Sequence, residues 1–461
     1  MTTPYAHQVE ALHKMQGKEA FALLMGMRTG KTKVIIDEWV ADGMPDLLVV
    51  APAGAYRTWE GEIRKHAPYS DANIGVWDSS EESRIILTRP GRPKVFLTNV
   101  EAYSTVTDMR VAAQLFLQEG NATMVVDEST TIKSMDSKRG KVIRELGKLA
   151  KKRRILSGLP TPQSPLDLYG QFEFLDHSIL NFVSYTAFKQ RYAVTRKMKV
   201  GGYWIDIVKR YQNVEDLWGK IETHSFRRRL EDCADVPPKS YVIRDVVLTA
   251  EQKRMYEEMK EYATTQLASG EHVTSQQVIT TMLRLHQICC GRVVDEQGIS
   301  HQVPSTRMQS LVDLLREYDG KAIVWFTYAA DLEDAGRKIE REHGAGSVAR
   351  FWGGNRATRE EESRRFKEDP ACRFMLATPG SGGRGRTWPE AGLLVYYSNS
   401  DNLEHRDQSE ERASSISRVD RVTVVDMMAR GTVEEKIIHA MRKKIDLATV
   451  VTNDNWREWV V

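Results

Sequence analysis

Short apolar runs alternate with helical patterns along most of this chain, and this alternation constrains the fold more than any other feature. One series of runs lies at residues 21–25, 47–50, 94–98, 123–126 and 154–157. A second series lies at 322–326, 348–351, 374–377, 393–397 and 422–425. Short β-rich runs separated by helices predict parallel strands. We therefore expect an α/β chain with two parallel sheets, each flanked by helices.

The composition is that of a globular chain and excludes several other classes. Of the 461 residues, 41% are hydrophobic and 28% are charged, which excludes a disordered or low-complexity chain. None of the four cysteines forms a C-x-x-C pair, which argues against a zinc ribbon. No apolar run reaches about 18 residues, and the first residues lack a signal segment. We therefore expect a cytoplasmic protein with no membrane segment.

The pattern changes between the two series. From about residue 177 to 235, aromatic and basic residues interleave around a Gly201-Gly202 turn, which predicts helices and a hairpin. Residues 250–290 have a helical pattern. We expect a first domain at 1–240 with an insertion at about 177–235, a helical insertion or linker at 241–300, and a second domain at 301–461.

A glycine-rich segment between an apolar run and a helical pattern is the first candidate site. It is Met25-Gly-Met-Arg-Thr-Gly-Lys-Thr32, and backbone N–H groups at such a helix start can cradle phosphate. Lys31 would reach the β- and γ-phosphates, and the Thr32 hydroxyl would bind Mg²⁺. Met25 stands where the strict phosphate-loop pattern has its first glycine. The alternative is therefore that the Gly-Lys-Thr sequence occurs by chance at the start of a helix.

Two acidic residues at the end of another apolar run form the second candidate site. Asp127 and Glu128 follow Val125-Val126, where carboxylates could hold Mg²⁺. Glu128 could also position and deprotonate the attacking water. An acidic helix cap after an edge strand is the alternative. Together, the two segments predict a nucleoside triphosphatase.

The order of the motifs resembles that of the SWI/SNF-type ATPases of helicase superfamily two, in the compact form found in phages and bacteria. The matching segments are Tyr5-Ala-His-Gln8, Val49-Val-Ala-Pro52 with Trp59-Glu60, Asp127-Glu-Ser-Thr130, Leu156-Ser-Gly-Leu-Pro-Thr-Pro162, Thr378-Pro-Gly-Ser-Gly-Gly-Arg-Gly385, Gln408-Ser-Glu-Glu-Arg412 and Gly431-Thr-Val-Glu-Glu-Lys436. The resemblance covers nearly the whole chain. It implies two RecA-like lobes, with ATP and Mg²⁺ as cofactors and DNA as partner, in the cytoplasm of a bacterium or a phage-infected cell.

The resemblance also implies roles for individual residues. The catalytic candidates are Lys31, Glu128, Arg412 and Arg418, and the metal-binding candidates are Thr32, Asp127 and Glu128. The nucleotide-binding candidates are Gln8, Gly26, Arg28, Thr29, Gly30, Lys31, Thr32, Gly383 and Gly385. The nucleic-acid-binding candidates are Thr98, Asn99, Lys133, Arg153, Thr378, Gly380 and Arg384.

Two departures from the family pattern weaken a simple transfer of function. Arg28 stands where the family usually has glycine, and an arginine can serve there if its φ is negative. The second arginine of the motif around Arg412 falls on Ser415, so that Arg418, one helical turn further, is either a substitute or a surface charge.

Two basic segments, at residues 133–154 and 189–210, favour a nucleic-acid surface, and the second also carries aromatic residues. Solvated helix faces are the alternative. We expect an ATP-dependent translocase on double-stranded DNA that remodels DNA or DNA–protein complexes as a monomer, with DNA-bound proteins or a targeting partner. A strand-separating or branch-migrating helicase, which a pin at 196–211 would favour, stays open, as does a nucleic-acid-binding module with a weakened ATPase.

Overall fold

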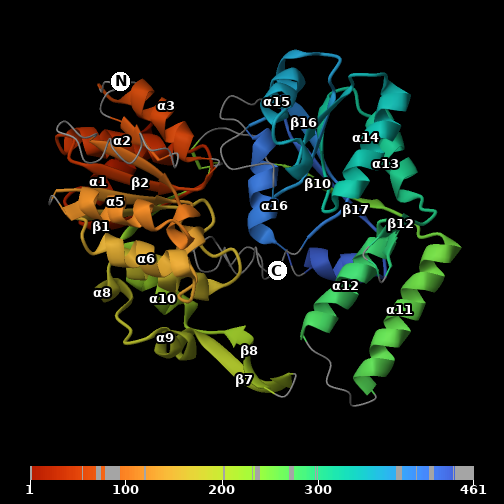
Figure 1. The fold of residues 1–461 in the computed structure, drawn as a ribbon, viewed down its shortest axis with the longest axis horizontal. Helices are drawn as coiled ribbons and strands as arrows, with labels where there is room; N and C mark the ends of the chain where they lie inside the picture. Colours follow the sequence, from red (N-terminus) through yellow and green to blue (C-terminus); the bar gives the residue numbers. More distant parts are fainter. Residues whose placement is uncertain are drawn as a thin grey trace. The chain divides into compact units, whose positions relative to one another are not determined.

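A computed structural model describes most of the chain. The described residues are 3–53, 55–68, 74–77, 94–118, 121–200, 203–230, 232–233, 239–268, 275–295, 297, 299–380, 387–400, 402–414, 420–439 and 441. The chain divides into two compact units (Figure 1). Their described parts lie within 3–194 and 210–233 for the first unit, and within 195–209 and 239–441 for the second. No described helix is long and apolar enough to cross a membrane.

The first unit is built on a seven-stranded sheet whose strand order is β3-β4-β2-β5-β6-β1-β9. The strands are β1 (Ala20–Met25), β2 (Leu47–Ala51), β3 (Ile74–Val76), β4 (Val95–Asn99), β5 (Thr123–Asp127), β6 (Lys152–Leu156) and β9 (Ser225–Arg228). All the paired strands run parallel. Every residue of β1 and β2 is buried, as expected of a parallel sheet that is covered on both faces.

Helices and short 3-10 turns connect these strands. They are α1 (Ala6–Met15), α2 (Lys31–Ala41), α3 (Tyr56–His66), η2 (Ala102–Ser104), α5 (Thr107–Gln118), η3 (Ser129–Ile132), α6 (Lys138–Gly147), η4 (Pro165–Asp167) and α7 (Leu168–Leu175). Apolar side chains of α1, α2 and α3 join those of the central strands in one core.

The segment after α7 contains the expected helices and hairpin. Its elements are α8 (His177–Leu180), α9 (Tyr185–Tyr192), β7 (Ala193–Val200), β8 (Tyr203–Tyr211) and α10 (Val214–Glu222). A cluster of aromatic rings packs α9 against α7, and its members are Tyr169, Phe182, Tyr185, Phe188 and Tyr192. These aromatic residues therefore hold the segment together.

The second unit is built on a six-stranded sheet whose strand order is β10-β17-β16-β13-β15-β14. The strands are β10 (Ser240–Asp245), β13 (Lys321–Trp325), β14 (Val348–Phe351), β15 (Phe374–Ala377), β16 (Ala391–Tyr396) and β17 (Thr423–Met428), and all the paired strands run parallel. The expected fold class of two parallel α/β sheets is confirmed.

The other elements of this unit are mainly helical. They are α11 (Ala250–Ala268), α12 (Ser275–Cys289), the antiparallel pair β11 (Arg292–Val294) and β12 (Ser300–Gln302), α13 (Arg307–Arg316), α14 (Ala329–His343), η5 (Gly353–Asn355), α15 (Arg359–Glu368), α16 (Leu403–Glu410) and η6 (Glu411–Ala413). The predicted helical stretch at 250–290 corresponds to α11 and α12.

All ten predicted apolar runs overlap strands, but three described strands of the two large sheets were not predicted, nor was the short pair β11 and β12. The three strands are β3, β9 and β10, each at an edge of its sheet. Edge strands are partly exposed, so they lack the continuous apolar run on which the prediction rests. β9 contains Arg227 and Arg228, and every residue of β10 is exposed or half-buried.

Candidate nucleotide-binding site

The loop between β1 and α2 has the backbone of an anion-binding loop. β1 ends at Met25, and Gly30 precedes the first residue of α2 with a left-handed φ of 82°. A Cβ atom at Gly30 would lie 2.1 Å from Nε2 of Gln8, so a larger residue would displace that amide, and the left-handed φ itself favours glycine. The first N–H groups of α2 have no partners within the helix and are available to an anion at this end.

The Lys31 ammonium lies on this loop. Its Nζ donates to the carbonyl oxygen of Met25 at 2.9 Å and to that of Gly26 at 3.1 Å. The buried Thr29 hydroxyl donates to the Gly26 oxygen at 2.8 Å, which closes the loop on itself. Because the two acceptors of Lys31 are neutral carbonyls, a phosphate oxygen would be a stronger partner for the ammonium.

The condition set for an arginine at position 28, a negative φ, is not met. The φ of Arg28 is 65°, in the left-handed region where residues with a Cβ atom are uncommon. Strained backbone of this kind costs about 1–3 kcal/mol and is concentrated at functional sites. The backbone at position 28 therefore adopts a conformation that glycine favours, although an arginine occupies this position.

Two side chains of α1 fasten that helix to the loop. His7 Nε2 lies 2.8 Å from the carbonyl oxygen of Thr29, and Gln8 Nε2 donates to the same oxygen at 3.1 Å. The Gln8 amide is oriented from its other end, because the Tyr5 N–H donates to Oε1 at 2.9 Å. The structure thus brings Gln8 together with Thr29, Gly30 and Lys31.

Asp127 and Glu128 end β5 at the same edge of the sheet as this loop. β6 pairs with both β1 and β5, and Leu156 is opposite both Leu23 and Asp127. Trp59 Nε1 donates to Asp127 Oδ2 at 3.0 Å, and the Glu128 N–H donates to Oδ1 at 2.9 Å. The carboxylate of Asp127 is therefore held in one orientation.

The donor set at this edge suits Mg²⁺. A hydroxyl at Thr32 and carboxylates at Asp127 and Glu128 are hard oxygen ligands of the kind this ion prefers. Glu128 has a left-handed backbone with φ 48°, which gives the chain a sharp turn directly after the strand. When bound, Mg²⁺ would neutralise charge on the phosphates.

Gln171 is a connecting residue that the sequence analysis missed. Its Oε1 accepts from the Ser129 hydroxyl at 2.7 Å, and its Nε2 donates to the carbonyl oxygens of Pro160 and Asp167 at 2.7 and 2.8 Å. The fully buried amide thereby links the segment after Glu128 to the segment around Pro160. The helical position of Gln171 gave no signal of this role.

Arg412 lies in the second unit, in η6 directly after α16. The residue is buried, and its carbonyl oxygen accepts from the Trp388 N–H at 2.7 Å. Ser415, Arg418, Gly383, Arg384 and Gly385 lie outside the described residues.

The nucleic-acid candidates of the first unit are occupied by contacts within that unit. The fully buried Thr98 hydroxyl donates to the Val49 oxygen at 3.0 Å, so its side chain offers no exposed donor. Asn99 Oδ1 accepts from the Ala102 N–H at 2.8 Å, and Lys133 Nζ lies 3.5 Å from Asp167 Oδ2.

Arg153 lies at the end of the sheet opposite the loop, because its partner on β1 is Ala20. Its side chain is 18% exposed and lies 3.9 Å from Asp176. In the second unit, Thr378 and Gly380 follow the carboxyl end of β15 and are half-buried and exposed, respectively.

Much of the basic segment 133–154 stabilises the fold. The Arg154 guanidinium is fully buried and donates to Glu38 through Nε at 3.0 Å and Nη2 at 2.6 Å. The Arg144 guanidinium donates to the carbonyl oxygens of Ile132 and Met135. The charge of these arginines is therefore used inside the unit.

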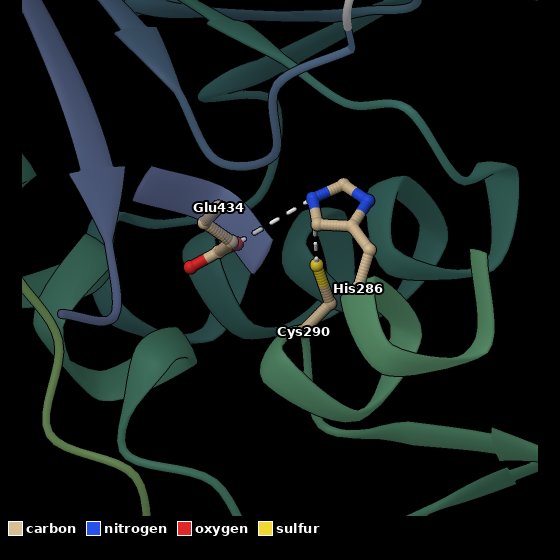
Figure 2. A group of neighbouring side chains, drawn as sticks. All are labelled: His286, Cys290 and Glu434. Carbon is tan, nitrogen blue, oxygen red and sulfur yellow. Dashed lines mark hydrogen bonds and ion pairs between the residues drawn. The ribbon is translucent and has the colours of Figure 1, made fainter. Parts of the chain in front are cut away.

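A buried cluster of His286, Cys290 and Glu434 has atoms close enough for a metal ion (Figure 2). Its chemistry fits an internal ion-pair network better. His286 Nε2 lies 3.5 Å from Glu434 Oε1, and burial raises the pKa of the Cys290 thiol well above its ordinary value. Glu434 is bonded by the buried Arg307 guanidinium, and His286 Nδ1 lies 2.8 Å from the Tyr328 hydroxyl.

Comparison with known proteins agrees with this geometry. A sequence model of the SNF2-related domain matches residues 11–293. The chain belongs to the SNF2-related family. The SNF2-related match includes the loop before α2, the Asp127-Glu128 pair and the insertion at 177–235.

Among similar proteins, one from Bacillus subtilis (strain 168) is named as an ATP-dependent helicase/translocase and is 24% identical over 89% of this chain and 43% of its own length. An ATP-dependent helicase of Mycoplasma pneumoniae, described as uncharacterized, is 22% identical over 94% of this chain and 40% of its own length. This SNF2-related chain thus spans about two fifths of the length of these relatives. The SWI2/SNF2 ATPase core of Sulfolobus solfataricus, solved with double-stranded DNA, aligns with a TM-score of 0.43 at 20% identity over 100% of this chain and 95% of its own.

Proposed function

We propose that this chain is a DNA-dependent ATPase that translocates along double-stranded DNA and remodels DNA or DNA-bound proteins. The observation that carries the proposal is the loop before α2. There, a left-handed glycine and the Lys31 ammonium lie at the same sheet edge as Asp127 and Glu128. Family membership and the names of the relatives support ATP as the nucleotide and DNA as the partner.

Within this proposal each group has a chemical role. The N–H groups at the start of α2 and the Lys31 ammonium bind the phosphates, and Thr32 and Asp127 hold Mg²⁺. Glu128 accepts the proton of the attacking water. Arg412 stabilises the negative charge that develops in the transition state.

The contact surface for DNA is proposed to include residues near the carboxyl ends of strands. Thr378 and Gly380 are the described candidates with accessible atoms in the second unit. Backbone amides and hydroxyls there would position the phosphate backbone without reading the base sequence. The fully buried Thr98 side chain is left out of this set.

Translocation is tested by displacement of a third strand from a DNA triplex. The wild-type chain with ATP is expected to release the triplex-forming strand, because movement along the duplex strips it. Arg412→Ala is expected to slow ATP turnover roughly 10³-fold and to abolish release. Steady DNA-stimulated hydrolysis without any release would contradict translocation while leaving the ATPase in place.

The hairpin gives a second candidate function, a strand-separating helicase. β7 and β8 form a two-stranded ribbon in which Trp204 is 66% exposed, and the same two strands carry exposed Arg196, Lys197, Lys209 and Arg210. An exposed aromatic ring among cations can stack on an unpaired base. A fork-unwinding assay tests this candidate, since unwinding that Trp204→Ala removes would favour the helicase over the translocase.

A further inference from the structure

Lys239 lies where the chain enters the second unit, and its side chain contacts the residues that precede Arg412. The first unit extends to residue 235 and the second resumes at 236, so Lys239 follows the crossing by three residues. β10 begins at the next residue and pairs with β17 along its whole length. The residue that follows Lys239 is therefore fixed to the sheet, because the Ser240 N–H donates to the carbonyl oxygen of Val422 at 2.9 Å.

The Lys239 ammonium joins two consecutive carboxylates. Its Nζ donates to Glu411 Oε1 at 2.7 Å and to Glu410 Oε2 at 3.4 Å. Tyr241, on β10, donates from its hydroxyl to Glu410 Oε2 at 2.8 Å. Consecutive residues of a helical turn point in different directions, so one ammonium that holds both carboxylates fixes the rotation of that turn.

The other carboxylate oxygen of Glu410 accepts from a second buried cation, Arg406. Arg406 Nε donates to Glu410 Oε1 at 2.6 Å, and its Nη atoms bond Asp426 on β17 at 2.5 and 3.2 Å. Burial raises the pKa of Glu410, but Lys239 and Arg406 outweigh this effect and the net pKa lies below its ordinary value. Glu410 therefore stays ionised and keeps all these partners.

We propose that Lys239 is a positioning residue for Arg412. Lys239 bonds Glu410 and Glu411, and Arg412 is the next residue in the same 3-10 turn. Lys239 therefore holds the turn that carries Arg412. This inference rests on the proposed role of Arg412 in ATP hydrolysis.

The test is the steady-state ATPase of the full chain with DNA. Lys239→Met removes the charge and keeps the length of the side chain. We expect kcat to fall roughly ten- to hundredfold because the arginine loses its orientation, with KM for ATP changed by less than about threefold. Lys239→Arg keeps the charge and is expected to recover most of the lost turnover.

Lys321 provides a matched control within the same unit. It is also a half-buried lysine at the start of a strand of this sheet, and its Nζ bonds the carbonyl oxygens of Phe366 and Asp369 near the end of α15. Lys321→Met should lower the unfolding temperature of the chain without changing kcat. It therefore measures what the loss of a structural lysine does by itself.

A double substitution separates positioning from general stability. If Lys239 acts through Arg412, Lys239→Met should cause no further loss of kcat in an Arg412→Ala background, because coupled residues are not additive. Independent, multiplying losses would overturn the proposal, as would a wild-type kcat in Lys239→Met. Arg412→Ala with wild-type turnover would overturn it too, and turnover of the wild-type chain no higher than that of Glu128→Gln would overturn the proposed function itself.

Discussion

At the scale of single residues, the candidate site depends on backbone conformations that side-chain chemistry alone does not specify. Arg28, Gly30 and Glu128 all have left-handed φ, and all lie at the carboxyl edge of the first sheet. The Gly-Lys-Thr pattern predicted a phosphate loop that ends at Gly30, and the role of Lys31 stays a prediction. The pattern did not predict the φ of Arg28, because a residue with a Cβ atom favours a negative φ.

Gly30→Ala is predicted to damage nucleotide binding, with Gly43→Ala as its matched control. The two glycines have nearly the same φ, 82° and 81°, but a Cβ atom at Gly43 meets nothing within 4 Å. Both changes should cost about 1 kcal/mol of stability through backbone strain. Only Gly30→Ala should also weaken ATP binding in a titration, because its Cβ atom displaces Gln8. Equal binding by the two variants would show that the loop is not the nucleotide site.

Glu128→Gln is predicted to lower turnover by roughly 10²–10⁴-fold while ATP still binds, because the amide cannot accept the proton of water. Glu145→Gln is the control, since Glu145 is an exposed residue of α6 whose ion-pair partner is Lys148. Rapid-quench measurement of phosphate formation separates ATP hydrolysis from ATP binding. Similar turnover in Glu128→Gln and the wild-type chain would remove Glu128 from the mechanism.

At the scale of elements, a buried ion pair joins one helix of each unit to the sheet of that unit. Arg154 on β6 bonds Glu38 on α2, and Arg406 on α16 bonds Asp426 on β17. The sequence analysis predicted the central strands from their apolar runs. It favoured a nucleic-acid surface for the basic segment 133–154, with solvated helix faces as the alternative. It did not predict the buried pairs, because a basic run has the same composition whether its charges face solvent or buried carboxylates.

Removal of Arg154 is predicted to destabilise the first unit strongly. Arg154→Leu leaves Glu38 buried without its main partner and should cost about 3–5 kcal/mol in chemical unfolding. The double variant Arg154→Leu with Glu38→Leu should recover much of this loss. Lys148→Ala breaks an exposed pair with Glu145 and should cost no more than about 1 kcal/mol. A loss of that small size in Arg154→Leu would show that the buried pair contributes little.

At the scale of the whole molecule, the proposed function requires both units. The candidate phosphate, metal and base residues lie in the first unit, whereas Arg412 lies in the second. The order of motifs along the sequence predicted this division of roles. The contacts that hold Arg412 in place, through Glu410, Glu411 and Lys239, could not be predicted because they join residues about 170 positions apart.

The most direct test of the account is ATP turnover by the full chain without nucleic acid and then with duplex DNA, single-stranded DNA and RNA, with Glu128→Gln as the blank. We expect slow turnover without nucleic acid and strong stimulation by duplex DNA, because translocation couples ATP hydrolysis to movement along the duplex backbone. Stimulation mainly by single strands would contradict it and favour the helicase. Turnover equal to the blank in every condition would contradict the ATPase itself.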